Sequence, residues 1–331
     1  MASTPLLRHD DSSFTHDLTD QQVTDYFDFR TRLAFAILSE REFFTHRYVN
    51  SDNARLTIQA FTSERAGGAA VTSRRRDGSS TTLIPKGRLD VRRPEHVSGS
   101  CELPRDLDQE LLHALEAAAK EGDVNWFPFS DALRLFVGGN TDSPDISQHT
   151  ELIDIVSAFS RLSGAWDQRG TVEGFLAAFR PETEPDRRYF GGVASNKALS
   201  TAMRSGKSIR EVWLGDAYVL RSQYGHGHVE APPYSAIWTT REHLLLAAFA
   251  FPLFAKGVLA KAGYYELTAD DVAKVEAFDT LATLKPFSGN PDNPNFPWRA
   301  ALSRARQRPM VLVLAKAFEE AMQSEASRTT S

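Results

Sequence analysis

Apolar residues recur at helical spacing through most of the chain. The clearest run has steps of four, four and three residues, at Ile209, Trp213, Ala217 and Leu220. Residues at this spacing share one face of an α-helix, so the pattern predicts a helix over residues 208–224. Gly225 and Gly227 follow it. Glycine is the residue most often found just past a helix end, so we expect the helix to stop there.

The same period predicts further helices on both sides of this one. The expected segments are 20–42, 104–119, 128–137, 149–162, 171–179, 195–204, 239–259, 270–284 and 298–324. Thr239 and Glu242 form a capping-box pattern at the start of one of them. Residues 244–259 are apolar, but Pro252 and Lys256 interrupt a run that is already shorter than the roughly 20 residues needed to cross a membrane. This segment therefore predicts a core helix.

Strand signals are confined to the first part of the chain. Residues 56–61 alternate between apolar and polar positions, as a half-buried strand does. Asp77-Gly78 is a hairpin-turn signal between possible strands at 70–75 and 81–84. We therefore expect a mainly α fold with three parts: a small mixed α/β domain over residues 1–100, a helical bundle over 101–265 and a helical extension over 266–331.

Composition is that of a soluble globular protein. The residues are 41% hydrophobic and 24% charged, which are ordinary values for such proteins. The length of 331 residues suffices for one large domain or two ordinary ones. Cys101 is the sole cysteine, so one chain cannot build a disulfide framework, and the N-terminus has no signal-peptide pattern. We expect a cytoplasmic protein with no membrane contact. The net charge of −5 gives no general attraction to nucleic acid, so any RNA contact must use a local patch.

Candidate chemistry lies at the end of the 208–224 helix. Arg221 and His226 are five residues apart, about 140° around an ideal helix, and a long arginine side chain can close that angle. A histidine titrates near neutral pH and can move the proton of a ribose hydroxyl, while an arginine stays charged and can hold the phosphate. His228 could take the place of His226. The simpler interpretation is that Arg221 caps helix carbonyls and His226 interacts with the helix dipole.

The stretch Leu220-Arg221-Ser222, followed by His226-Gly227, resembles a motif of the HEPN superfamily and, within it, of the ApeA-like group. In that group a core helix ends with L-R-S-x-x-x-H-G. The resemblance implies that the arginine and the histidine of this motif act together.

The resemblance extends upstream of the motif and covers roughly residues 105–260. Residues 131–146 and 152–156 look like the helix, acidic loop and helix that precede the motif in the ApeA-like group. One departure is Ser160, where relatives often have a glutamate late in the second of these helices.

Catalytic members of this family pair two chains so that both motifs face one cleft, and they cleave RNA without a metal ion or other cofactor. The resemblance implies a homodimeric endoribonuclease with Arg221 and His226 as catalytic residues. We also predict that Ser222, Tyr224 and His228 bind RNA beside them, although core packing explains Tyr224 more simply. Such proteins often serve in bacterial defence or toxin systems. The alternative is a non-catalytic module that binds a nucleotide or a partner protein, which the departure in the upstream helix favours.

A basic segment offers a second contact with RNA. Residues 65–93 carry eight lysines and arginines against two aspartates, a local net charge of +6 (eight minus two). Arg74, Arg75 and Arg76 are its densest part. On a hairpin they could follow a phosphate backbone, although a solvated strand face explains the same pattern.

Two other kinds of site find weaker support. A metal site could use His226 and His228 together with Glu230, because alternate residues of an extended segment point the same way. A catalytic zinc also needs a further protein ligand at a diagnostic spacing. The available His243 does not have that spacing and lies in a predicted helix. Ser222 invites a hydrolase interpretation, but it has no G-x-S-x-G elbow around it. We therefore predict no metal and no cofactor.

Overall fold

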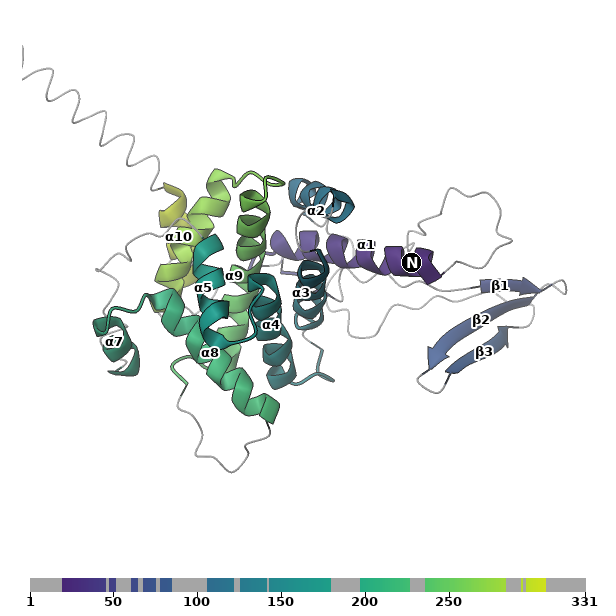
Figure 1. Cartoon of the computed structure of the whole chain (residues 1–331), viewed down its shortest axis with the longest axis horizontal. Helices are drawn as coiled ribbons and strands as arrows, with labels where there is room; N and C mark the ends of the chain where they lie inside the picture. Colours follow the sequence, from purple (N-terminus) through teal and green to yellow (C-terminus); the bar gives the residue numbers. More distant parts are fainter. Residues whose placement is uncertain are drawn as a thin grey trace, which may run out of the picture.

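The computed structural model of the chain is mainly helical, which confirms the prediction of a mainly α fold (Figure 1). A HEPN-like bundle with a preceding α/β domain stays a prediction. It describes residues 20–45, 48–51, 61–64, 68–75, 78–84, 106–121, 126–141, 143–179, 197–226, 236–283, 293 and 296–307.

The helices fall close to the segments that the hydrophobic period predicts. They are α1 (Asp20–Ser39), α2 (Gln109–Glu121), α3 (Trp126–Gly138), α4 (Gln148–Ser163), α5 (Gln168–Ala178), α7 (Lys197–Arg204), α8 (Ile209–His226), α9 (Thr240–Lys261) and α10 (Ala269–Thr283), and residues 297–307 are helical as well.

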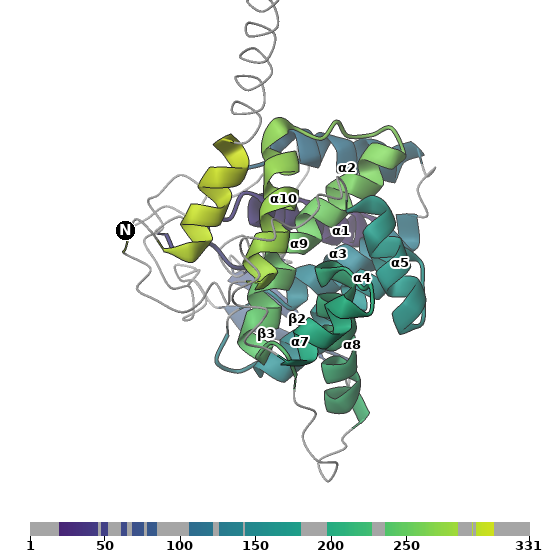
Figure 2. The same ribbon diagram turned by 90° about the vertical axis from the view of Figure 1, so that its left-hand side faces the viewer.

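Helix α9 runs through the middle of the helical body, where it contacts α1, α2, α4, α5 and α10 (Figure 2). At its start the Thr239 hydroxyl accepts a hydrogen bond from the backbone N–H of Glu242, and the Glu242 carboxylate accepts one from the N–H of Thr239. The predicted capping box is therefore confirmed. The helix is long and apolar enough to cross a membrane, but 78% of its most apolar window is buried inside the protein. Such burial is compatible with a core helix of a soluble protein.

One cluster of buried side chains joins helices from all three predicted parts. Phe35 of α1 lies edge-on to Phe136 of α3 and Phe251 of α9, with ring centres 5.6 and 5.9 Å away. Phe278 of α10 and Trp298 belong to the same cluster. Described helices on both sides of residues 100 and 265 therefore share one cluster, in which aromatic rings from distant segments fill one another's gaps. The division into three domains stays a prediction.

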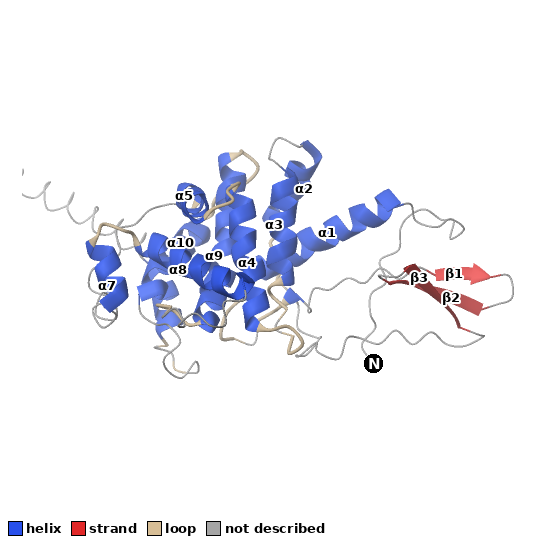
Figure 3. Cartoon of the chain, turned by 60° about the horizontal axis from the view of Figure 1, so that its bottom comes forward, coloured by secondary structure: helices blue, strands red, loops and turns tan. Residues whose placement is uncertain are grey.

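Three short strands form an antiparallel sheet in the order β1-β2-β3, to one side of the helices (Figure 3). They are β1 (Phe61–Glu64), β2 (Gly68–Arg75) and β3 (Gly78–Ile84). Arg75 pairs with Gly78 at the predicted turn. The strand predicted at 56–61 lies mostly outside the described residues. The helix of the predicted α/β domain, α1, packs on α2, α3 and α9 of the helical body. A separate α/β domain over residues 1–100 therefore stays a prediction.

Several predicted helix ends differ from the observed ones, among them the end of α8 and the start of α2. Helix α8 continues through Gly225 to His226, so Gly225 is a helical residue and not the stop that we predicted. Helix α2 begins at Gln109, where the Asp108 carboxylate accepts a hydrogen bond from the N–H of Leu111. Pro104, the predicted start, lies outside the described residues. A capping carboxylate decides this boundary more strongly than a proline nearby.

Candidate functional site

Arg221 lies near the end of α8 and extends toward α4. Its Nη2 donates a hydrogen bond to the Ser157 hydroxyl at 3.2 Å, and its guanidinium carbon lies 5.7 Å from the ring centre of Tyr218. These two contacts hold the guanidinium at a fixed place on the face that α4 and α8 share.

The Arg221 guanidinium keeps unused binding capacity. Its Nε is buried and has no hydrogen-bond partner, and no carboxylate among the described residues forms an ion pair with it. A buried N–H without a partner costs about 1–3 kcal/mol, and a half-buried cation attracts an anion more strongly than an exposed one. An oxyanion, such as a phosphate, would accept the missing hydrogen bond from Nε and would balance the charge of the guanidinium.

The α4 residue that meets Arg221 is Ser157, one helical turn before Ser160. The Ser160 hydroxyl donates to the carbonyl of Val156 and accepts a hydrogen bond from the Thr171 hydroxyl on α5. Ser160 is therefore engaged with a different helix. The sequence resemblance that singled out Ser160 could not show this, because Ser157 and Ser160 share one face of α4 and only the packing shows that α8 covers one turn of that face and α5 the next.

Asp154 lies one further turn toward the start of α4. It is half-buried, and burial raises the pKa of its carboxyl above the ordinary value of 3.8. No cation in the described part of the chain forms an ion pair with this carboxylate. Asp154 is thus an acid with a raised pKa on the helix that contacts Arg221, and the hydrophobic pattern did not single it out.

Tyr224, one turn after Arg221, joins the start of α4 to the start of α9. Its ring stacks on the imidazole of His149, with centres 3.8 Å apart and planes inclined by 23°. Its hydroxyl lies 3.0 Å from that of Thr240. His149 is exposed, and no local motif pointed to it; only the packing of α8 on α4 brings this histidine to the predicted site.

The other predicted site residues are described to different extents. His226 is the last residue of α8, and its side chain is not described. Ser222 is half-buried in the same helix. His228 and Glu230 lie outside the described residues. The pairing of Arg221 with His226, and the role of His228, therefore remain predictions.

The basic patch is described only in its backbone. Arg74 and Arg75 belong to β2, their side chains are not described, and Arg76 lies outside the described residues. Contact between this patch and RNA stays a prediction.

His243 is buried in α9, and one of its ring nitrogens is engaged by a carboxylate. Its Nε2 lies 2.9 Å from the Asp216 carboxylate, which also accepts hydrogen bonds from the N–H groups of Ile237 and Trp238. The Asp216 carboxylate thus fixes the backbone of Ile237 and Trp238 just before α9. Within the described part of the chain, no three histidine, cysteine or acidic side chains lie close enough together to hold a metal ion.

Comparison with protein-family models, with curated proteins and with solved structures finds no match to this chain. The function must therefore be argued from the site itself.

Proposed function

We propose that this protein is a metal-independent endoribonuclease of the HEPN type, acting as a cytoplasmic homodimer in a defence or toxin system. One observation carries the proposal: Arg221 presents a half-buried cation with no carboxylate partner among the described residues and a buried N–H that lacks a hydrogen bond. That is what a clamp for a backbone phosphate requires.

The chemistry needs an acid and a base besides the clamp. The ribose 2′-oxygen attacks phosphorus, forms the new P–O2′ bond and displaces the 5′-oxygen. One histidine takes the 2′-hydroxyl proton, and a second protonates the leaving 5′-oxygen. In this proposal each chain supplies one such histidine, His226, so two chains complete the site. The products carry a 2′,3′-cyclic phosphate and a 5′-hydroxyl, and Arg221 stabilises the charge that grows on the phosphoryl oxygens.

A second candidate is a non-catalytic module that binds a nucleotide or a partner protein. It is favoured by the face of α4 next to Arg221, which offers the Ser157 hydroxyl and no acid paired with the arginine. Such a module would use the same phosphate clamp for binding and would not need His226.

The test is RNA cleavage in EDTA by the purified protein and its variants. His226→Ala should lower the rate by about 10²–10⁴, the usual cost of losing a general acid–base group. Its thermal melt should stay nearly unchanged, since a residue at the end of a helix contributes little to packing. Arg221→Ala should weaken both RNA binding and turnover, and Arg221→Lys should restore little, because lysine lacks the planar fork.

His228→Ala is the comparison variant, and it should lower the cleavage rate far less than His226→Ala does. If His228→Ala abolishes cleavage and His226→Ala does not, the longer spacing is the working one. Binding that depends on Arg221, without cleavage by any form, would favour the binding module. Cleavage that EDTA removes, or that survives both histidine substitutions, would contradict the proposed mechanism.

A further inference from the structure

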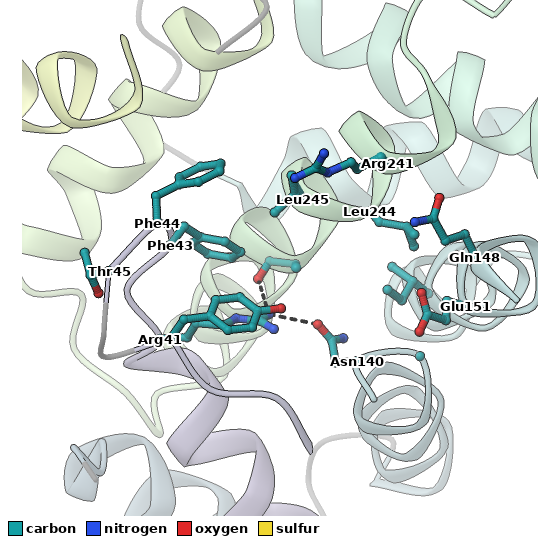
Figure 4. Close-up of a pocket in the computed structure, with 14 residues that line it drawn as sticks. Arg41, Phe43, Phe44, Thr45, Asn140, Gln148, Glu151, Arg241, Leu244 and Leu245 are labelled. Atoms are coloured by element: carbon teal, nitrogen blue, oxygen red, sulfur yellow. Dashed lines mark hydrogen bonds between the residues drawn. The ribbon is translucent and has the colours of Figure 1, made fainter. Parts of the chain in front are cut away.

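A cavity of about 410 Å³ opens between the segment after α1 and the first turns of α4 and α9 (Figure 4). Its size lies within the range of small-molecule sites, about 300–1,000 Å³. Phe43, Phe44 and Tyr48 form an aromatic wall, and Leu244 and Leu245 of α9 form an aliphatic one. An aromatic wall facing an aliphatic one suits a ligand with a flat apolar ring system.

A buried arginine is built into the aromatic wall. Arg41 is 7% exposed, and its Nη2 donates to the Asn140 side-chain oxygen at 2.9 Å and to the carbonyl of Ala248 at 3.2 Å. Its guanidinium carbon lies 4.8 Å from the ring centre of Phe43 and 5.7 Å from that of Tyr48. The hydrogen bonds to Asn140 and Ala248 are the dashed lines in Figure 4. They fix a cation where water is largely excluded, so its field acts on whatever enters the cavity.

The charges that line the cavity favour one negative charge in a ligand. Arg41 and Arg241 stand against Glu151, a net charge of +1 (two minus one). Arg241 is exposed in the first turn of α9, and it forms no ion pair with the described part of the chain. Gln148, on the first turn of α4, adds an amide that can donate a hydrogen bond.

We propose that this cavity binds a small aromatic carboxylate. The ring lies against Phe44 and Tyr48, and the carboxylate meets the guanidinium of Arg241, whose planar fork matches two carboxylate oxygens. Arg41 stays bound to Asn140, and its charge favours the anion over a neutral ligand of the same shape. This site does not depend on RNA cleavage, and it would exist in a non-catalytic protein as well.

The experiment titrates the full chain with 2-naphthoate and with 2-naphthamide, two probes of one shape that differ in charge, by calorimetry. The unmodified protein should bind the acid at least about tenfold more tightly than the amide, a difference of about 1.4 kcal/mol. Arg241→Gln should weaken binding of the acid about tenfold or more and change binding of the amide less than about twofold, because only the acid uses the lost charge. Leu245→Trp should weaken both, since the indole occupies the cavity.

Arg169→Gln is the matched control, because Arg169 is an exposed arginine on α5 that does not line the cavity. It should leave both affinities unchanged. A thermal melt verifies that Leu245→Trp is folded; if it is not, the effect of Arg241→Gln on the two probes decides alone. Equal binding of acid and amide, acid binding that Arg241→Gln leaves intact, or no binding of the acid at about 1 mM would overturn the proposal.

Discussion

Lys256 of α9 lies between two carboxylates in the interior. Its ammonium is 2.6 Å from Asp271 and 2.7 Å from Asp108, and all three side chains are nearly fully buried. Asp271 also accepts hydrogen bonds from the hydroxyls of Tyr265 and Thr268. This cluster joins the starts of α2 and α10 to α9, and its charges stabilise the fold only while all of them are present.

The pKa values of this cluster predict how stability depends on pH. Burial alone would raise the pKa of Asp271, but Lys256 and the bonds from Thr268 outweigh it and hold that pKa below 3.8. Burial would lower the pKa of Lys256, but Asp271 and Asp108 outweigh it and raise that pKa above 10.5. The contribution of Asp271 is therefore present above its unfolded value and lost as the pH falls below about 4. The contribution of Lys256 to stability is lost only above pH 10.5.

Urea unfolding at a series of pH values tests this prediction. The free energy of unfolding should fall as the pH goes from 5 to 3, because the unfolded chain then binds more protons than the folded one. Asp271→Asn should lower the free energy of unfolding at pH 7 by about 3–5 kcal/mol, since it leaves the buried ammonium of Lys256 with one carboxylate fewer. Between pH 5 and pH 3, the free energy of unfolding of this variant should fall less than that of the unmodified protein. If the free energy of unfolding falls equally in Asp271→Asn and in the unmodified protein, groups other than Asp271 govern acid unfolding.

At the scale of elements, α9 approaches the end of α5 closely at Gly257. A Cβ atom added at Gly257 would overlap the carbonyl oxygen of Ala178. Backbone atoms cannot move aside as the end of a side chain can, so only glycine allows this contact. The approach lets Phe254 of α9 pack edge-on against Phe175 of α5, with ring centres 5.3 Å apart.

Gly257→Ala should therefore destabilise the protein by about 1–3 kcal/mol in urea unfolding. Gly138→Ala is the matched control: Gly138 is also helical, but a Cβ there meets nothing within 4 Å. It should be neutral or stabilising by up to about 1 kcal/mol, because alanine loses less conformational entropy in a helix. Equal effects of the two substitutions would mean that the α5–α9 contact is not as close as described.

At the scale of the whole molecule, the proposed mechanism requires two chains. Trp166 is 82% exposed and adjoins α8, so we expect it to lie in the interface of the proposed dimer. The Tyr218 hydroxyl donates to its carbonyl at 3.2 Å, and the same Tyr218 ring contacts Arg221. A large exposed aromatic beside a proposed shared cleft fits the centre of an interface.

We expect a dimer in sedimentation experiments at micromolar concentration, with a two-fold axis near Arg221. Trp166→Glu should shift the protein to monomer and lower RNA cleavage with it. Phe127→Glu is the matched control: Phe127 is 85% exposed but lies in the first turn of α3, which packs on α1 and α4, and it should leave the dimer intact. A strictly monomeric protein would count heavily against a composite site.

The sequence alone determined where most helices lie and which of their faces are apolar. The period of apolar residues and the capping box at Thr239 are local signals, set by geometry within about four residues along the chain. For the same reason the sequence placed Arg221 near the end of a helix. It misjudged the end of α8, because a glycine can lie in the last turn of a helix as well as just past its end, as Gly225 does.

Only the tertiary structure decided which side chains meet. It brought His149 onto Tyr224, and it placed Arg41 against the carbonyl of Ala248, 207 residues away along the chain. It also gave Arg221 its partner on α4, Ser157. An apolar period specifies that a helix face is buried, but it does not specify the neighbouring helix or the turn at which the two make contact. These depend on how side chains of distant segments fit into one another.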